Sequence, residues 1–216
     1  MNNDNPHFSR SGILFIVSAP SGAGKTTLCD SLRLKPDFVY SVSTTTRTPR
    51  PGEIDGEDYH FVSEKTFLSM IENSEFLEHA KVHGNYYGTN KQAVTENLNN
   101  GIDVLIDIDI QGAALIRQCK DPQIRTALVD IFIMPPNLEE LRRRLVKRGT
   151  ETDEQIKTRI ANAATEMQHW QDYKYTIISG SMEEDIEKFR AVMRAERYVS
   201  TRMHQLPTGS HTEKKS

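Results

Sequence analysis

The sequence lacks the features that mark secreted, metal-binding and membrane-spanning proteins. Its 216 residues include only two cysteines, Cys29 and Cys119, too few for a disulfide scaffold and wrongly spaced for a metal knuckle. The seven histidines form no HExxH or comparable ligand pattern. No apolar run approaches the roughly 20 residues that span a bilayer. The polar start, MNNDNPHFSRSG, has no apolar stretch of the kind found in signal peptides. We therefore expect a cytoplasmic protein.

An excess of charge of one sign is also missing. The formal net charge is −3 at pH 7, so there is no electrostatic case for a nucleic-acid partner. Hydrophobic residues make up 37% of the chain and charged residues 26%, an ordinary balance for a single domain with a substantial core. We expect neither a nucleic acid nor a membrane as partner, whereas a monomer and a homo-oligomer both remain open.

Strands and helices are predicted to alternate along most of the chain. Apolar runs typical of strands buried on both faces of a sheet occur at 13–17, 103–107, 128–134 and 175–178. Helical patterns occur at about 25–34, 110–118, 137–147, 154–171 and 182–203. Such alternation predicts an α/β fold with a parallel sheet and right-handed crossovers. The polar ends are predicted to be tails, a disordered one at 1–11 and another at 201–216.

Residues 41–90 break this alternation. They contain short strand-like pieces at 59–62 and 76–82, a helical pattern near 64–72, and the turn-rich stretches TPRPGEIDGED and HGNYYG. The pattern predicts a subdomain inserted into the α/β domain.

The strongest single motif follows the first predicted strand and precedes a helix. The segment Ala19-Pro-Ser-Gly-Ala-Gly-Lys-Thr26 fits the P-loop pattern GxxxxGK[ST], with Ala19 in place of the first glycine. Its glycines let several backbone N–H groups converge, and the helix behind adds the positive end of its dipole. Lys25 can reach β- and γ-phosphates, and the Thr26 hydroxyl suits Mg²⁺ or a phosphate oxygen. By itself the motif predicts a P-loop NTPase or a nucleotide kinase. The predicted nucleotide-binding residues are Ala19, Pro20, Ser21, Gly22, Ala23, Gly24, Lys25, Thr26 and Thr27.

Two further features fit phosphate chemistry. Asp107 ends an apolar run, where a P-loop enzyme places the carboxylate that holds the water ligands of Mg²⁺ and orients a substrate phosphate. Arg47 and Arg50 lie three apart in a proline-bounded loop, and guanidinium groups suit phosphate better than lysine does. On its own, this arginine pair fits a solvated surface equally well.

Several motifs, taken together, resemble the guanylate kinase family in its bacterial single-domain form. They are the P-loop, the segment from Ser41 to Glu53, Asp58-Tyr59, Glu78, Gly84-Asn-Tyr-Tyr-Gly-Thr89 and Asp107-Ile-Asp-Ile-Gln-Gly112. They match in order and spacing, and the resemblance covers about residues 12–200. It implies a three-layer P-loop fold with a core at 12–40, 91–135 and 172–200, a GMP-binding subdomain at about 41–90 and a helical lid at about 136–171. The implied reaction transfers the γ-phosphoryl group of MgATP to GMP, giving GDP and ADP, as a step of purine nucleotide metabolism.

The resemblance also implies roles for individual residues on the GMP side. Guanine presents N1–H and an exocyclic amine as adjacent donors, and an ionised carboxylate accepts from both. Glu78 occupies the family's position for this contact. The other residues implied to bind GMP are Arg47, Arg50, Tyr59 and Tyr87 at the phosphate, Ser43, Thr89 and Asp109 at the base, and Asp107.

A second implied set surrounds the transferring phosphoryl group. Arg144, Arg148 and Arg159 match the family's lid arginines, which cover the triphosphate on closure and neutralise charge that develops in the transition state. With Lys25, Arg47 and Asp107 they form the predicted catalytic set. Thr26 and Asp107 are implied to hold Mg²⁺, largely through waters.

One position departs from the family pattern. Relatives commonly place an asparagine that contacts adenine just after the last strand, whereas this chain has Ser179, followed by Gly180. A short hydroxyl replaces a group that both donates and accepts. We therefore expect weaker discrimination among the bases of the phosphoryl donor.

Two alternatives share the fold: an interaction module, which belongs to another functional class, and another small-molecule kinase. A non-catalytic guanylate-kinase-like module that binds protein partners would have lost P-loop or GMP-site residues, but Lys25, Arg47 and Glu78 are all present. A ribosyl-phosphate kinase of the same fold would not need the base-reading pair Glu78 and Thr89. A regulatory P-loop NTPase would have no use for the insertion at 41–90.

Overall fold

The computed structural model describes residues 8–82, 84–148 and 152–205, except for the side chain of Arg148. Its centre is a five-stranded parallel sheet with the order β10-β9-β2-β8-β3. The strands are β2 (Leu14–Ser18), β3 (Val39–Tyr40), β8 (Val104–Asp107), β9 (Leu128–Met134) and β10 (Tyr175–Ile178). Because β2 pairs with parallel strands on both sides, all five of its residues are buried. The predicted α/β class is confirmed.

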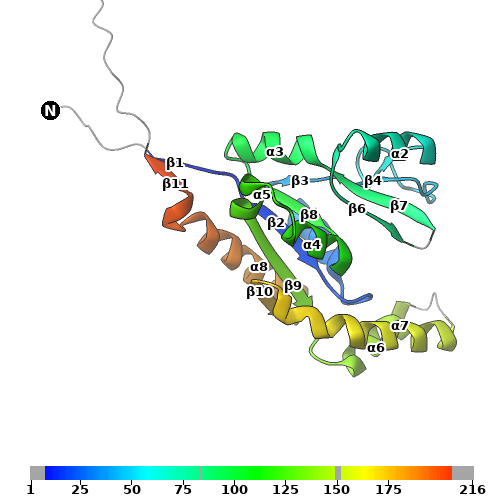
Figure 1. The fold of residues 1–216 in the computed structure, drawn as a ribbon. Helices are drawn as coiled ribbons and strands as arrows, with labels where there is room; N and C mark the ends of the chain where they lie inside the picture. The colour runs from blue at the N-terminus through cyan, green and yellow to red at the C-terminus, as the bar shows by residue number, and fades with distance from the viewer. Residues whose placement is uncertain (1–7, 83, 149–151, 206–216) are drawn as a thin grey trace, which may run out of the picture.

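Helices cover both faces of this sheet (Figure 1). One face packs against α1 (Lys25–Arg33) and α8 (Met182–Arg197), and the other against α3 (Lys91–Asn99), α4 (Ile110–Arg117) and α5 (Pro122–Ala127). The helices α3 and α5 were not predicted, although Asn90 and Asp121 cap their N-termini with side-chain oxygens, which is a signal readable in sequence. No helix within the described residues is both long and apolar enough to cross a membrane.

A second, four-stranded sheet is built from the segment that broke the alternation. Its order is β5-β4-β7-β6, with β4 (Thr44–Thr45), β5 (His60–Phe61), β6 (Phe76–Val82) and β7 (Asn85–Asn90), and α2 (Glu64–Glu72) packs beside it. Most of HGNYYG, interpreted as a turn, is the strand β7. A Cβ at Gly88 would lie 2.7 Å from the Phe76 ring, so only glycine lets that ring cover the strand. Tertiary packing thus overrides the turn propensity of Asn and Gly.

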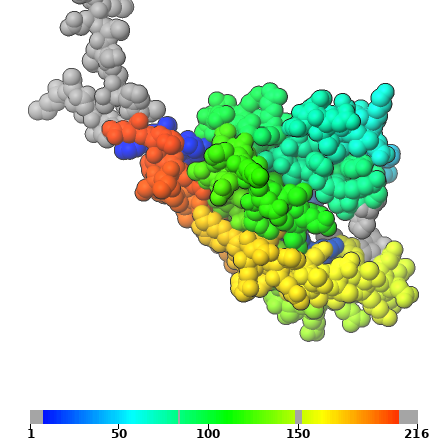
Figure 2. Space-filling model, in the orientation of Figure 1, coloured from blue at the N-terminus to red at the C-terminus, as the bar shows by residue number. Residues whose placement is uncertain are grey.

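Two helices form a hairpin beside the core, α6 (Leu138–Arg148) and α7 (Asp153–Glu166), followed by the 3-10 helix η1 (Met167–Asp172). The hairpin has a small apolar centre of its own, made by Leu141, Leu145, Ile156 and Ala163. Figure 2 shows the surface hollowed between this hairpin and the second sheet. The hairpin and the second sheet therefore stand as two arms on one end of the molecule (Figure 1).

The expectation of tails at 1–11 and 201–216 was wrong where the structure describes those segments. Strand β1 (Phe8–Arg10) pairs antiparallel with β11 (Met203–Gln205), and η2 (Ser200–Arg202) precedes β11, so α8 ends at Arg197 and not near residue 203. The ribbon is tied to the core by Asp103, whose buried carboxylate accepts from Arg10 (Nη2–Oδ2, 3.0 Å) and Arg197 (Nε–Oδ2, 2.7 Å). Arg10 and Asp103 are 93 positions apart, so the polar ends carry no local sign of this partner. The predicted tail segments 1–7 and 206–216 lie outside the described residues.

Candidate active site

The phosphate-binding motif connects the central strand β2 to α1. Gly22 and Gly24 adopt positive φ angles of 88° and 98°, which side-chain-bearing residues rarely adopt. Gly24 is the N-cap of α1 and provides no side-chain hydrogen bond, so the first N–H groups of the helix are left for a ligand. Because N–H groups and a helix dipole converge here, the turn is suited to bind an anion.

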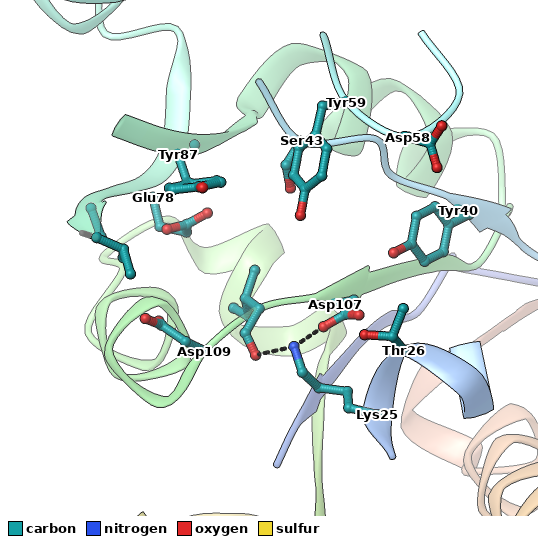
Figure 3. Close-up of a pocket in the computed structure, with 14 residues that line it drawn as sticks. Lys25, Thr26, Tyr40, Ser43, Asp58, Tyr59, Glu78, Tyr87, Asp107 and Asp109 are labelled. Carbon is teal, nitrogen blue, oxygen red and sulfur yellow. Dashed lines mark hydrogen bonds and ion pairs between the residues drawn. The ribbon is translucent and has the colours of Figure 1, made fainter. Parts of the chain in front are cut away.

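Lys25 begins α1 and faces the end of the neighbouring strand β8. Its ammonium group forms an ion pair with Asp107 and donates to the backbone oxygen of Ile108 at 3.2 Å (Figure 3). Burial lowers the pKa of Lys25, while nearby charges, including that of Asp109, act in the opposite direction. The structure therefore brings the predicted lysine and carboxylate into direct contact.

The cavity beside Lys25 collects most of the residues predicted for the GMP side. It is lined from α1 by Lys25 and Thr26, from the second sheet and its loops by Ser43, Tyr59, Glu78 and Tyr87, and from the end of β8 by Asp107 and Asp109 (Figure 3). Tyr40 and Asp58 also line it, and sequence reasoning gave neither a role. Asp58 accepts from the N–H of Ile54 at 2.8 Å, and a lone tyrosine such as Tyr40 carries no signal in sequence.

Glu78 lies in the wall of this cavity with 8% of its surface exposed. The Thr89 hydroxyl donates to its Oε1 at 2.7 Å. Burial raises the pKa of Glu78 to about 7, and the charge of Asp109 adds to this effect, while the hydrogen bond from Thr89 opposes it. A Cβ at Gly112 would lie 3.1 Å from Glu78 Oε2, so this glycine in α4 lets the helix approach the carboxylate closely. Glu78 is thus an acceptor held in a tight, partly desolvated place.

The arginine loop is organised by a residue to which sequence reasoning assigned no role. Glu53 accepts from Arg47 Nη2 at 2.8 Å and from the backbone N–H of Arg50 at 2.7 Å. The Arg47 guanidinium also lies over the ring of Tyr59, 5.3 Å from its centre. The hydrogen bond that Arg47 donates to Glu53 raises the pKa of Arg47. The Arg50 side chain is exposed, and neither arginine is among the residues that line the cavity.

Two of the three arginines predicted for the lid contact the P-loop in this structure. Arg144 donates from Nη1 to the backbone oxygen of Ala23 and to the hydroxyl of Ser179, both at 3.1 Å. Arg159 donates to the hydroxyl of Ser21, with 2.8 Å from Nη2, and a carboxylate oxygen of Glu166 accepts from the Ser21 N–H at 2.9 Å. Glu166 was not anticipated. Arg148 ends α6, and its side chain lies outside the described residues.

A dedicated metal cage is not formed within the described ranges. No group of three or more histidine, cysteine, aspartate or glutamate side chains converges there. Thr26 and Asp107 do line the same cavity and present a hydroxyl and a carboxylate. Mg²⁺ prefers oxygen ligands and keeps several waters, bound through one or two carboxylates and substrate phosphates. These two oxygen donors therefore fit Mg²⁺ bound together with a nucleotide.

Comparisons with known proteins give a consistent result. A model of the family described as guanylate kinase matches residues 11–196. The guanylate kinase of Paramagnetospirillum magneticum is 45% identical over 203 residues, covering 94% of this chain and 93% of that protein. That of Maricaulis maris is 49% identical over 190 residues, covering 87% and 85%. Among solved structures, the guanylate kinase from Anaplasma phagocytophilum superimposes with a TM-score of 0.75 at 36% identity, covering 91% of this chain and 92% of that one.

Proposed function

The chain belongs to the guanylate kinase family, and from this premise we propose how its residues bind and join the two substrates. It is an ATP:GMP phosphotransferase, which gives GDP and ADP in purine nucleotide metabolism. The observation that carries the proposal is the single cavity in which P-loop residues Lys25 and Thr26 face the acidic residues Glu78 and Asp109. A phosphate at one end and a guanine at the other match the two ends of this cavity.

GMP is proposed to bind with its base against Glu78. The carboxylate has one oxygen bonded to Thr89 and further lone pairs for the N1–H and amine donors of guanine. Adenine lacks this pair of adjacent donors, so it would leave a buried carboxylate unpaired. Ser43 and Asp109 line the same cavity and complete the polar surroundings of the base.

The GMP phosphate is proposed to bind Arg47, Arg50, Tyr59 and Tyr87. Tyr59 and Tyr87 line the cavity, and the centres of their rings are 6.0 Å apart. The Arg47 guanidinium lies over the ring of Tyr59. Glu53 holds Arg47 before the substrate arrives, which lowers the ordering cost of binding. Closure of the arginine loop over the cavity would bring both guanidinium groups to the phosphate.

ATP is proposed to bind with its triphosphate on residues 19–27. Thr26 and Asp107 would hold Mg²⁺ with its waters, and the metal, when bound, neutralises charge on the β- and γ-phosphates. The lid residues Arg144, Arg148 and Arg159 are proposed to cover the triphosphate. The contacts of Arg144 with Ala23 and of Arg159 with Ser21 support this because they already link the hairpin to the P-loop.

The transfer itself needs positioning and charge neutralisation. An oxygen of the GMP phosphate attacks the γ-phosphorus of ATP, and the new P–O bond forms as the bond to the bridging oxygen of ADP breaks. Lys25 stabilises negative charge on the transferring group, and Asp107 orients Lys25 through their ion pair. Because the attacking oxygen is already anionic, no general base is required.

ATP and GMP are the substrates, and we place the protein in the cytoplasm, where both nucleotides are available. A non-catalytic interaction module and a ribosyl-phosphate kinase are not favoured, because Lys25, Asp107 and Glu78 line one cavity. The proposal is tested by mixing the protein with MgATP and GMP, AMP, CMP or UMP and following ADP. Rapid ADP formation with GMP, and not with the other three monophosphates, supports the proposal. Equal rates with AMP would show that Glu78 does not read the base, and no transfer to any of the four would overturn the assignment of this cavity.

A further inference from the structure

A second cavity adjoins the P-loop and is separate from the one described above. On the side of the P-loop and α1, this cavity is lined by residues 22–24, Thr27 and Leu28. The cavity proposed to bind GMP is lined there by Lys25 and Thr26. Its apolar walls include Leu28, Ile133 and Met182. A triphosphate on the P-loop with its γ-phosphate toward Lys25 has its nucleoside end on this side. The inference below therefore rests on the proposed donor site.

The polar end of this cavity is built around a buried carboxylate. Asp185, in the first turns of α8, is 4% exposed. One of its oxygens accepts from the Ser179 hydroxyl at 2.7 Å and the other from the Gly180 N–H at 2.8 Å. Lys188 Nζ lies 4.0 Å from the same carboxylate. Asp185 is the one carboxylate among the described residues lining this cavity.

The hydrogen bonds of the Ser179 hydroxyl determine what it can offer to a ligand. Its single hydrogen is donated to Asp185, and its oxygen accepts from Arg144 Nη1 at 3.1 Å. A hydroxyl has one donor and two acceptor lone pairs, so Ser179 cannot also donate to a ligand without releasing Asp185. Each Asp185 oxygen retains a lone pair. Ser179 and Asp185 together therefore present acceptors to whatever enters this end of the cavity.

We propose that Asp185, positioned by Ser179, is the specificity-determining residue for the donor base and selects a base with an exocyclic amine. The 6-amine of adenine donates to this acceptor pair. A 6-carbonyl, as in hypoxanthine or guanine, places an acceptor against these acceptors, so the remaining lone pairs of the carboxylate receive no hydrogen bond from that position. The short side chain of Ser179 thus does not by itself relax base selectivity, because the residue that contacts the base is Asp185, in the first turns of α8.

The test compares ATP with ITP as phosphoryl donors at saturating GMP. ATP carries an amine at the 6-position of its purine, and ITP carries a carbonyl there. Hydrogen bonds to charged groups are worth about 10- to 100-fold in a binding ratio. We expect wild-type kcat/KM for ATP to exceed that for ITP by at least about 10-fold. Asp185→Asn, which can donate to a carbonyl, should reduce this ratio to near unity while the KM for GMP stays unchanged. Glu187 is an exposed carboxylate on the same helix, and Glu187→Gln makes the matching change to a carboxamide, so it should leave the ratio as in wild type.

The outcomes separate this inference from the proposed function. If the wild type uses ATP and ITP equally well to phosphorylate GMP, the inference fails and the proposed function stands. If neither donor phosphorylates GMP, the proposed function fails. If Asp185→Asn lowers turnover with both donors equally, Asp185 only supports the loop and the inference is overturned. Should that variant not fold, Ser179→Ala with calorimetric binding of ATP and ITP answers the same question, because a retained wild-type ratio there would also contradict the role of the pair.

Discussion

Lys25 and Asp107 form an ion pair between the first residue of α1 and the last residue of β8, and both line the cavity proposed to bind GMP. The same ammonium group reaches the backbone oxygen of Ile108 at 3.2 Å. The pair is partly buried, and burial lowers the pKa of Lys25. A phosphate that binds beside the pair therefore gives Lys25 a second anionic partner, and the lysine does not first have to be ordered.

Removing this ammonium should affect the chemical step far more than GMP binding. Lys25→Met is expected to lower kcat by a factor on the order of 10³ or more, because charge on the transferring phosphoryl group loses its nearest cation. The affinity for GMP, measured by calorimetry without ATP, should survive. Lys91→Met, at a half-exposed lysine paired with Asp121, is the control and should behave as wild type. A Lys25→Met enzyme that keeps a tenth of wild-type kcat would contradict this role.

Replacing the carboxylate of Glu78 should weaken discrimination between GMP and AMP. A base that mismatches buried polar groups can be rejected by roughly 10⁴-fold, because those groups are left unpaired. Glu78→Gln keeps the size but offers one acceptor and adds a donor, so the KM for GMP should rise and the GMP-to-AMP ratio of kcat/KM should fall. Thr89→Val, which removes the hydroxyl bound to Glu78, should shift the ratio in the same direction by less. An unchanged ratio in Glu78→Gln would show that guanine is read elsewhere.

The raised pKa of Glu78 predicts a pH dependence of both binding and stability. Below about 7 the group is protonated and loses acceptor capacity, so the KM for GMP should rise as the pH falls through that value. For stability, the folded state binds this proton more readily than the unfolded state, whose group titrates near 4.5. The free energy of unfolding should thus fall as the pH rises from about 4.5 to about 7, by up to about 3 kcal/mol. Urea unfolding at pH 5 and pH 8 measures this, and the loss should disappear in Glu78→Gln. Equal pH slopes in the two proteins would refute the assignment.

Glu53 should act by holding the arginine loop in place. Because it binds Arg47 and the backbone of Arg50, Glu53→Gln is expected to raise the KM for GMP several-fold with a smaller change in kcat at saturation. The matched control is Glu57→Gln, which converts an exposed carboxylate of the same loop to a carboxamide. Tighter GMP binding in Glu53→Gln would mean that Glu53 competes with the phosphate for Arg47 instead of preparing it.

The buried carboxylate of Asp103 should matter for stability and not for substrate selectivity. Asp103→Asn leaves Arg10 without its charged partner and removes one of the two carboxylates that pair with Arg197, the other being Asp37. Removing one member of a buried ion pair costs about 3–5 kcal/mol. Urea unfolding should show this loss, with the GMP-to-AMP preference of the folded enzyme unchanged. Asp30→Asn removes an exposed pair with Arg33 at 3.9 Å and should change stability by less than about 1 kcal/mol. Equal stabilities of the two variants would mean that Asp103 does not tie the ribbon of β1 and β11 to the core.

Local structure was largely readable from the sequence. The apolar runs at 128–134 and 175–178 and the helical pattern at 64–72 coincide with β9, β10 and α2, since side-chain periodicity and continuous apolar character are properties of neighbouring residues. Strand β7 was missed because its Asn and Gly residues favour turns in isolation, and its pairing with β6 outweighs that preference. The ribbon of β1 and β11 was missed because its two strands are almost a whole chain apart.

The site divides in the same way. The sequence by itself determined the P-loop, the arginine loop and the positions that match the guanylate kinase family, since each is a short contiguous motif. Only the tertiary structure decided the raised pKa of Glu78, the hold of Glu53 on Arg47, and the junction of Ser179 with Asp185 and Arg144. Desolvation and the charge of a partner depend on which elements the fold brings together. No spacing along the chain encodes that the start of α8, the end of β10 and the hairpin of α6 and α7 meet around one hydroxyl.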